Sequence, residues 1–150
     1  MIYGVISDVH LHAWSTFSNQ TAGGTNSRLE ITLAEVRRAA EAIRDAGGTR
    51  MVLAGDLFHT RGVMDPEVLN PTRAVFEEIL EYLDVFAIPG NHDLKSNDTQ
   101  ALSSAIQNLE QISVTGGAFT IFNEASILPD KDQPLGFVPW VESIDDLHAT

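Results

Sequence analysis

The chain has 150 residues, of which 43% are hydrophobic and 20% charged, a balance that suits one globular domain and argues against a disordered chain. A net charge of −12 argues against a broad electrostatic footprint on nucleic acid, although bound cations would cancel part of that charge locally. Cysteine does not occur, which excludes disulfides and thiolate metal sites and leaves oxygen and imidazole ligands.

Three short apolar runs predict buried strands. They cover residues 2–7, 50–54 and 84–89, are rich in β-branched or aromatic side chains, and are bounded by Gly or Pro. No stretch approaches the ~20 apolar residues that a membrane span needs. No basic segment of the kind found in secretory signals precedes the first strand. We therefore expect a cytoplasmic protein with no membrane partner.

Two segments with helical periodicity separate these strands. In the first, apolar residues step by three and four from Ser27 onward, and Gly47 and Gly48 predict its end. The second is predicted over residues 71–83, with Pro71 in the first turn, where a missing N–H costs little. The resulting β-α-β-α-β order predicts an α/β fold with a parallel sheet, right-handed crossovers and helices packed on the sheet.

The rest of the chain has a weaker pattern. Residues 99–110 predict a third helix, and residues 112–114, 119–122 and 136–140 predict short strands. Residues 129–134 contain two prolines and three charged side chains, which is typical of a hairpin turn or an exposed loop.

Polar side chains follow each of the three predicted strands directly. They are Asp8 and His10 after the first strand, Asp56 and His59 after the second, and Asn91, His92 and Asp93 after the third. The carboxyl ends of parallel strands share one edge of the sheet, so we expect these groups to converge in the crevice where ligands bind. The first two segments alone equally suit a simple turn, whereas the third is more specific, because three adjoining side chains with metal or acid capacity rarely occur by chance. The three in order favour a metal-dependent hydrolase.

The spacing of these residues suggests separate metal-binding roles. Asp8 and His10, two residues apart, leave the strand end on the same side and can reach one ion. Asp56 is suited to bridge two ions, and Asn91 offers a neutral oxygen to the second. Such a two-metal centre activates water for in-line attack on phosphorus.

The remaining polar residues suggest acid–base roles. We interpret His92 as the general acid that protonates the leaving oxygen, and Asp93 as the carboxylate that orients it. His59 is placed to contact the phosphate or the leaving group. No residue is assigned to substrate binding.

Other residues near these segments have two interpretations each. Trp14 and Phe17 suit stacking on a base, although packing of their loop against the domain is the preferred interpretation. His12 is interpreted as a solvated loop residue, with contact to the substrate as the alternative. Three arginines suit either phosphate contacts or surface ion pairs, namely Arg28, Arg61 and Arg73.

Asp8-x-His10, Gly55-Asp56-x-x-His59 and Gly90-Asn91-His92-Asp93 resemble the motifs of the calcineurin-like metallophosphoesterase family. Within that family, residues 55–59 and 136–140 are most similar to the nuclease subunit of SbcD-type double-strand-break-repair exonucleases, including phage versions. The resemblance spans nearly the whole chain. It implies a four-layer αββα sandwich of two β-sheets flanked by helices.

The resemblance also implies a function. It implies phosphodiester hydrolysis of DNA or of a smaller ester at two divalent ions, most often Mn²⁺, with an ATPase partner subunit in the nuclease branch. The implied metal ligands are Asp8, His10, Asp56 and Asn91, with His92 as acid and His59 taking part in catalysis.

The chain departs from the family in its histidines. The family adds a His and then a Gly-His-x-His segment further along, whereas this chain has His only at positions 10, 12, 59, 92 and 148. We therefore expect residues 1–150 to form the N-terminal part of one metallophosphoesterase domain, with an exposed edge in its second sheet. The alternatives are completion by a second chain or a homodimer, and a non-catalytic interaction or scaffold module with an incomplete metal site.

Overall fold

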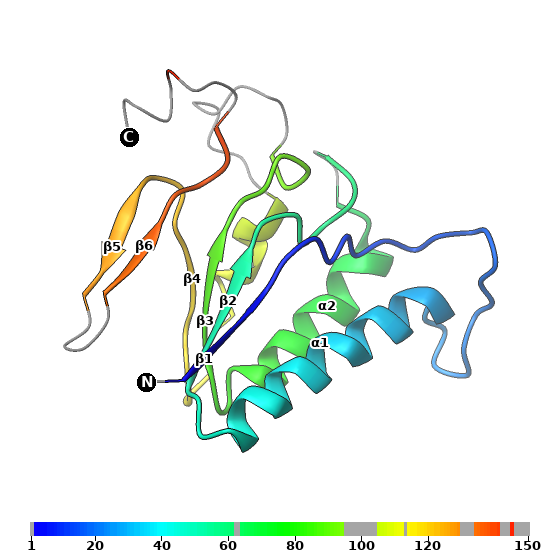
Figure 1. The fold of residues 1–150 in the computed structure, drawn as a ribbon. Coiled ribbons are helices and arrows are strands. Elements are labelled where there is room, and N and C mark those ends of the chain that lie inside the picture. The colour runs from blue at the N-terminus through cyan, green and yellow to red at the C-terminus, as the bar shows by residue number, and fades with distance from the viewer. Residues whose placement is uncertain are drawn as a thin grey trace.

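A four-stranded sheet with the order β1-β2-β3-β4 forms the centre of the molecule (Figure 1). The computed structural model describes residues 2–61, 64–94, 105–112, 114–129, 134–141 and 145. The strands are β1 (Tyr3–Ile6), β2 (Arg50–Ala54), β3 (Asp84–Ile88) and β4 (Phe119–Ile121). Each pairs in parallel with its neighbour, which confirms the predicted parallel α/β arrangement.

Helix α1 (Ser27–Asp45) crosses one face of this sheet (Figure 1). The side chain of Asn26 caps its first turn by accepting hydrogen bonds from the N–H groups of Arg28 and Leu29. Its apolar stripe is buried, as the periodicity predicts. The helix ends at the predicted glycine pair, where Gly47 has a φ of 82° and donates to the Arg44 carbonyl.

Helix α2 (Pro66–Ile79) lies beside α1 and corrects the predicted boundaries. It begins at Pro66, because the Asp65 side chain caps the N–H of Glu67 and Pro66 takes the first helical position, which needs no N–H donor. Pro71 therefore lies inside the helix, where it removes one backbone hydrogen bond.

The main core fills the space between the sheet and the two helices. Strand alternation turns Met51, Leu53 and Val85 toward this core, whereas Val52 and Phe86 face the opposite side. The approach of α1 to β1 requires glycine at position 4, because a Cβ there would lie 2.4 Å from Cδ1 of Ile43. The helical layer is thus packed directly against the strands that lead to the predicted site.

A second, smaller sheet covers part of the opposite face. It consists of β5 (Ser126–Leu128) and β6 (Leu135–Phe137), paired antiparallel. The Phe137 ring stacks on Phe122 with centroids 4.2 Å apart and packs in a cluster with Val52 and Phe86. The described residues therefore supply a helical layer and two sheets, consistent with part of the four-layer αββα architecture.

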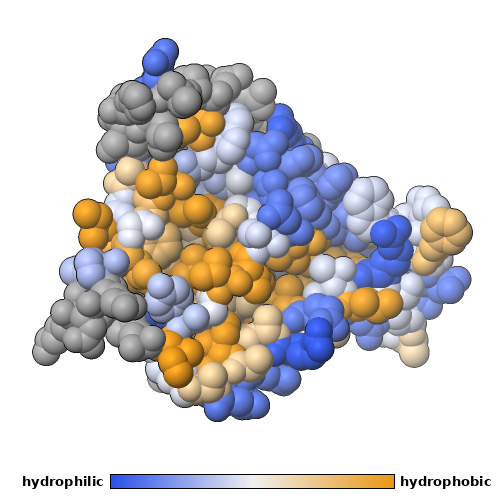
Figure 2. All heavy atoms as spheres, in the orientation of Figure 1, coloured by the Kyte–Doolittle hydropathy of each residue, from blue (hydrophilic) through white to orange (hydrophobic). Residues whose placement is uncertain are grey.

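Strand β1 is the outer strand of the parallel sheet and is left partly uncovered. It pairs with β2 alone among the described strands, and Val5 on its outer face is 56% exposed. Figure 2 shows apolar side chains gathered in the middle of this view, between the β5–β6 pair and the two helices. The exposed edge expected from the sequence lies in the second sheet, whereas this uncovered strand belongs to the first, parallel sheet, so the expectation for the second sheet stays a prediction.

The structure corrects several expectations for the second half of the chain. In place of a helix over residues 99–110, the described residues form the 3-10 helix η1 (Ala105–Leu109), and residues 99–104 lie outside the described part. Ile112 and Val114 belong to no strand. Strand β5 was not predicted, because three residues carry too short an alternation. Most of the predicted 129–134 loop and His148 also lie outside the described residues.

No helix in the described part of the chain combines the length and the apolar character needed to cross a bilayer.

An ion pair joins the two helices across their exposed sides. Arg37 of α1 donates to both carboxylate oxygens of Glu78 on α2, at 2.6 and 3.0 Å. The hydrogen bond from Arg37 lowers the pKa of Glu78 below its ordinary value of 4.5. A group with a depressed folded-state pKa stabilises the fold above its unfolded pKa, and this contribution is lost as the pH falls through the folded pKa.

We predict that Glu78→Gln destabilises the protein at pH 7 by about 0.5–1 kcal/mol, a small value because both side chains are partly exposed to solvent. The difference from wild type should disappear at acidic pH, once the pH has fallen through the lowered pKa of Glu78 and the carboxylate is protonated. Urea unfolding at the two pH values measures this. An equal destabilisation at both would contradict the ion-pair explanation.

Candidate active site

The loops that follow β1 and β2 remain paired beyond the ends of the strands. The His10 N–H donates to the Asp56 carbonyl at 2.9 Å, and the Leu11 N–H donates to the Leu57 carbonyl at 2.8 Å. The His59 N–H then donates back to the Leu11 carbonyl at 3.2 Å. This continued parallel pairing fixes His10, Asp56 and His59 relative to one another through backbone bonds.

The carboxylate of Asp93 attaches the third loop to the second. It is fully buried and accepts hydrogen bonds from the N–H groups of Phe58 at 2.9 Å, Gly90 at 2.9 Å and Leu57 at 3.3 Å. Burial raises the pKa of the Asp93 carboxyl, and these N–H donors oppose that rise. Asp93 therefore joins the backbones of the loops after β2 and β3.

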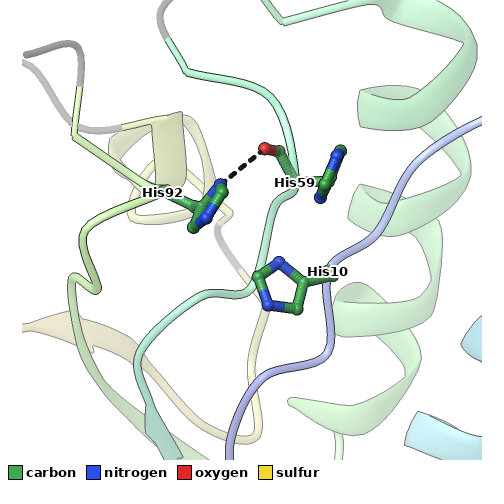
Figure 3. Close-up of side chains that lie close together, drawn as sticks. All are labelled: His10, His59 and His92. Carbon is green, nitrogen blue, oxygen red and sulfur yellow. Dashed lines mark hydrogen bonds between the residues drawn. The ribbon is translucent and has the colours of Figure 1, made fainter.

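This arrangement corrects the interpretation of Asp93 as the group that orients His92. The Nδ1 atom of His92 instead lies 3.0 Å from the carbonyl oxygen of His59 (Figure 3). The Asp93 carboxylate is committed to backbone N–H groups, because burial makes unpaired donors costly and the two loops after β2 and β3 supply three of them. The catalytic role assigned to Asp93 from the sequence stays a prediction. In the structure, Asp93 holds the backbones of two loops and so positions the residues that these loops carry.

Three predicted metal ligands have a left-handed backbone that side chains rarely adopt. The φ angles are 54° at Asp8, 50° at His10 and 53° at Asp56. Strain of this kind is costly and is concentrated at functional sites. Close packing enforces the geometry, since a Cβ at Gly90 would lie 2.1 Å from Oδ1 of Asp56.

The predicted ligands of the first metal ion do converge. Asp8, His10 and Asp56 each offer a ligand atom, and all three atoms lie within 4.8 Å of one another. His10 and Asp56 are partly buried, with Nε2 of His10 3.9 Å from Oδ2 of Asp56. Nδ1 of His10 is buried and has no hydrogen-bond partner among the described residues. The oxygen and imidazole donors, held close together, fit a divalent cation.

Asn91 lies beside Asp56, and its side-chain amide already forms hydrogen bonds. Oriented with its amide nitrogen toward Asp56, it donates to Oδ2 at 3.1 Å, and its oxygen accepts from Arg61 at 3.0 Å. The His92 N–H donates to Oδ1 of Asp56 at 2.9 Å. A second ion would therefore draw on Asp56 and on the Asn91 oxygen, which accepts from Arg61 in this amide orientation.

Three imidazoles meet at the same place. His10, His59 and His92 come from the loops after β1, β2 and β3, and Figure 3 shows their rings facing a common space. The His10 ring centroid lies 5.5 Å from that of His59 and 5.0 Å from that of His92. Burial lowers the pKa of His59, and the imidazoles of His12, His10 and His92 add to this effect.

His12 and Trp14 extend this aromatic surface. The Trp14 ring centroid lies 4.5 Å from those of both His12 and His59. Nδ1 of His12 is buried although the residue as a whole is half-buried, so this loop residue is only partly solvated and its contact with substrate stays a prediction. Phe17 is 94% exposed, which excludes the packing role for that ring. The signal available in the sequence was the spacing of His10, His12 and Trp14.

Two cavities border the site. One of about 240 Å³ is lined by Asp8, Asp56 and Asn91 and bounded by Val138 and Trp140. The other, of about 530 Å³, lies beyond His12. Its wall is largely apolar and includes Leu11, Ala13, Phe58, Met64 and Val68, together with Asp65 and Glu67.

Of the three arginines singled out in the sequence, one forms the expected ion pair with an acidic residue, and the phosphate contacts stay a prediction. Arg61 reaches Asn91 at the site. Arg28 lies over the Trp14 ring at 5.4 Å, and Arg73 pairs with Glu77 on α2.

Trp140 and Val138, which line the cavity beside Asp8, were not predicted as site residues. Their only sequence signal was the apolar run at 136–140.

Comparison with known proteins gives two findings. The profile of the calcineurin-like phosphoesterase family matches residues 1–144. A segment is 39% identical over 61 residues to "Uncharacterized protein R555" of Acanthamoeba polyphaga mimivirus, covering 39% of this chain. The match spans 4% of that relative's length.

We predict that Asp93→Ala destabilises the fold by about 2–4 kcal/mol, because it leaves several buried N–H groups without an acceptor. Urea unfolding measures the change. Glu124→Ala, at an exposed carboxylate, serves as the control and should stay within about 0.5 kcal/mol of wild type. A loss no larger than that of the control would contradict the proposed tie between the loops.

The backbone strain at Asp8 predicts an unusual order of stability. Asp8→Gly and Asp8→Ala both remove the carboxylate, but only glycine adopts a positive φ without steric cost. The Gly variant should be more stable than the Ala variant by roughly 0.5–1 kcal/mol in thermal or urea unfolding. At exposed Arg38 in α1 the same pair should show the opposite order. The same order at both positions would rule out strain at Asp8.

Proposed function

The chain belongs to the calcineurin-like phosphoesterase family, and from this premise we propose that it is a metal-dependent phosphodiesterase that cleaves DNA at a two-metal centre. The observation that carries the proposal is the convergence of Asp8, His10 and Asp56 within 4.8 Å, beside the His92 ring. The family accounts for metal-dependent hydrolysis of phosphoesters. Nuclease activity and a second metal ion go beyond what membership of the family accounts for.

The residues proposed to bind metal are ones whose positions are already fixed by the paired loop backbones and by close packing. Asp8, His10 and Asp56 would hold one divalent ion, and Asp56 with the Asn91 oxygen would contribute to a second. Divalent ions at such a centre supply Lewis-acid activation of the phosphoryl group and of water. Mn²⁺ suits these oxygen and imidazole donors.

His92 is the proposed general acid. Its Nδ1 lies 3.0 Å from the His59 carbonyl, which favours a proton on Nδ1 in the neutral ring and fixes the orientation of the imidazole. A second proton on Nε2 would then be the one transferred to the leaving oxygen. His59 positions His92 through its backbone, and its own ring lies close enough to contact a bound phosphate.

Three features support DNA as the substrate. The Trp14 ring offers a stacking surface 4.5 Å from His59, measured between ring centroids, and Arg28 lies over that ring. The cavity of about 530 Å³ beside His12 has room for a substrate group next to the reacting centre. Arg61, beside Asn91, brings a positive charge to an otherwise acidic chain. The resemblance to SbcD-type nucleases extends this proposal to an ATPase partner subunit.

One observation favours a second candidate, a non-catalytic binding module. Among the described residues, Asp56 and Asn91 are the ligands proposed for a second ion, and the Asn91 oxygen accepts from Arg61 when its amide nitrogen faces Asp56. Such a module would hold one ion or none and would not hydrolyse phosphodiesters.

We predict Mn²⁺-dependent hydrolysis of an aryl phosphodiester and of linear DNA. His92→Ala should lower kcat on DNA by about 10²–10⁴-fold, because the alkoxide leaving group needs a proton. The loss should be smaller on the aryl diester, whose leaving group is already stable as an anion. Steady-state kinetics with both substrates measures this, and chelation should abolish both activities.

Arg38→Ala, on the exposed side of α1, is the control and should leave kcat unchanged. Equal losses on the two substrates would exclude His92 as the acid. Failure of the wild-type chain to bind Mn²⁺ and to hydrolyse either substrate would leave the binding module.

A further inference from the structure

We propose that His10, His59 and His92 form a second metal site, selective for Zn²⁺ and similar ions, that competes with the carboxylate site because the two share His10. Each of the three rings offers a nitrogen within 4.8 Å of the others. Neither the family assignment nor the two-metal mechanism uses these three imidazoles as a ligand set.

The separation of the rings suits a small tetrahedral ion. At Zn–N distances of 2.0–2.1 Å, tetrahedral nitrogens lie about 3.3 Å apart. The three nitrogens already lie within 4.8 Å of one another, so side-chain rotations can bring them to that spacing. The His59 and His92 rings are nearly parallel, at 17°, and the His10 ring stands at 72° and 89° to them. The His10 ring thus approaches from a different direction, and side-chain rotation of the nearly parallel His59 and His92 rings is needed to turn their nitrogens toward one ion.

The backbones that carry these rings are fixed. The N–H groups of His10 and His59 donate to the carbonyls of Asp56 and Leu11, and the His92 N–H donates to the Asp56 carboxylate. Because the loops are joined in this way, little backbone ordering remains when an ion binds. A preformed site avoids that entropic cost.

Hydrogen bonding in the structure also suits the rings as ligands. The carbonyl of His59 faces Nδ1 of His92, so a proton on that atom leaves Nε2 with a free lone pair. Nδ1 of His10 is buried and has no hydrogen-bond partner among the described residues, while its Nε2 faces Asp56 at 3.9 Å. His10 can therefore serve either group of ligands.

The two ligand sets differ in the ions they favour. Asp8, His10 and Asp56 provide mainly carboxylate oxygen, which suits Mn²⁺ and Mg²⁺. Three neutral imidazoles suit Zn²⁺, Cu²⁺ and Ni²⁺, which also bind more tightly than Mn²⁺ in the general affinity order. An ion at the imidazole site would occupy His92 and withdraw His10 from the carboxylate site. If the proposed phosphodiesterase function holds, such an ion inhibits it.

Metal binding to the whole chain tests this without any activity assay. Equilibrium dialysis with Zn²⁺ and with Mn²⁺ would be compared for wild type, His59→Ala and Asp8→Asn. His59→Ala should weaken Zn²⁺ binding by about 100-fold or more and leave Mn²⁺ binding within about 3-fold of wild type. Asp8→Asn should do the reverse. His12→Ala, a neighbouring imidazole outside the set, is the matched control and should change neither affinity.

Competition between the sites gives a second measurement. In the Mn²⁺-loaded wild type, one equivalent of Zn²⁺ should release Mn²⁺, seen as the spectrum of the free ion in electron paramagnetic resonance. His59→Ala should need about 100-fold more Zn²⁺ for the same release. His59→Gln and thermal unfolding of every variant separate loss of a ligand from loss of the fold.

Parallel loss of Zn²⁺ and Mn²⁺ affinity in His59→Ala, or unchanged Zn²⁺ affinity, would overturn the imidazole site. Neither result depends on hydrolysis. A chain that shows the predicted binding but cleaves no phosphodiester would overturn the proposed function and leave this inference standing.

Discussion

The buried carboxylate of Asp93 is the contact on which the arrangement of the site depends. It accepts the N–H groups of Leu57 and Phe58 from one loop and of Gly90 from another. These donors would otherwise be buried without partners, a cost comparable to several hydrogen bonds. Because they flank Asp56 and His92, satisfying them also sets the separation of the groups proposed to bind metal and transfer a proton. A structural interaction thereby determines a chemical geometry.

The same loops hold backbone strain that the rest of the fold must balance. Asp8, His10 and Asp56 adopt positive φ angles, and glycine is required at position 90 because the Asp56 carboxylate lies against its Cα. Strained positions persist only where surrounding contacts determine them fully. Here those contacts are the paired loop backbones and the core between the sheet and helices α1 and α2. The strain directs side chains from the ends of β1 and β2 into one space.

The space at the strand ends is lined by two ligand sets, which share the His10 imidazole. Its two sides therefore differ in their chemistry. Its carboxylate side, with Asp8 and Asp56, borders the cavity of about 240 Å³. Its imidazole side continues through His59 into His12 and Trp14 and toward the larger cavity. An anionic phosphoester suits the boundary between them, where cations offset the carboxylates and imidazoles can exchange protons.

The sequence by itself determined the parallel α/β order and the residues that gather at the strand ends, because strand periodicity and strand direction are local properties that fix which edge a loop occupies. It also determined the limits of α1 through the periodicity that starts at Ser27 and the glycine at position 47. Only the tertiary structure decided that the Asp93 carboxylate accepts backbone N–H groups instead of orienting His92. It also decided that α2 begins at Pro66 and that His12 and Trp14 join the site. Those outcomes depend on which donors become buried and which rings meet across loops, and burial and long-range contact are not encoded in spacing along the chain.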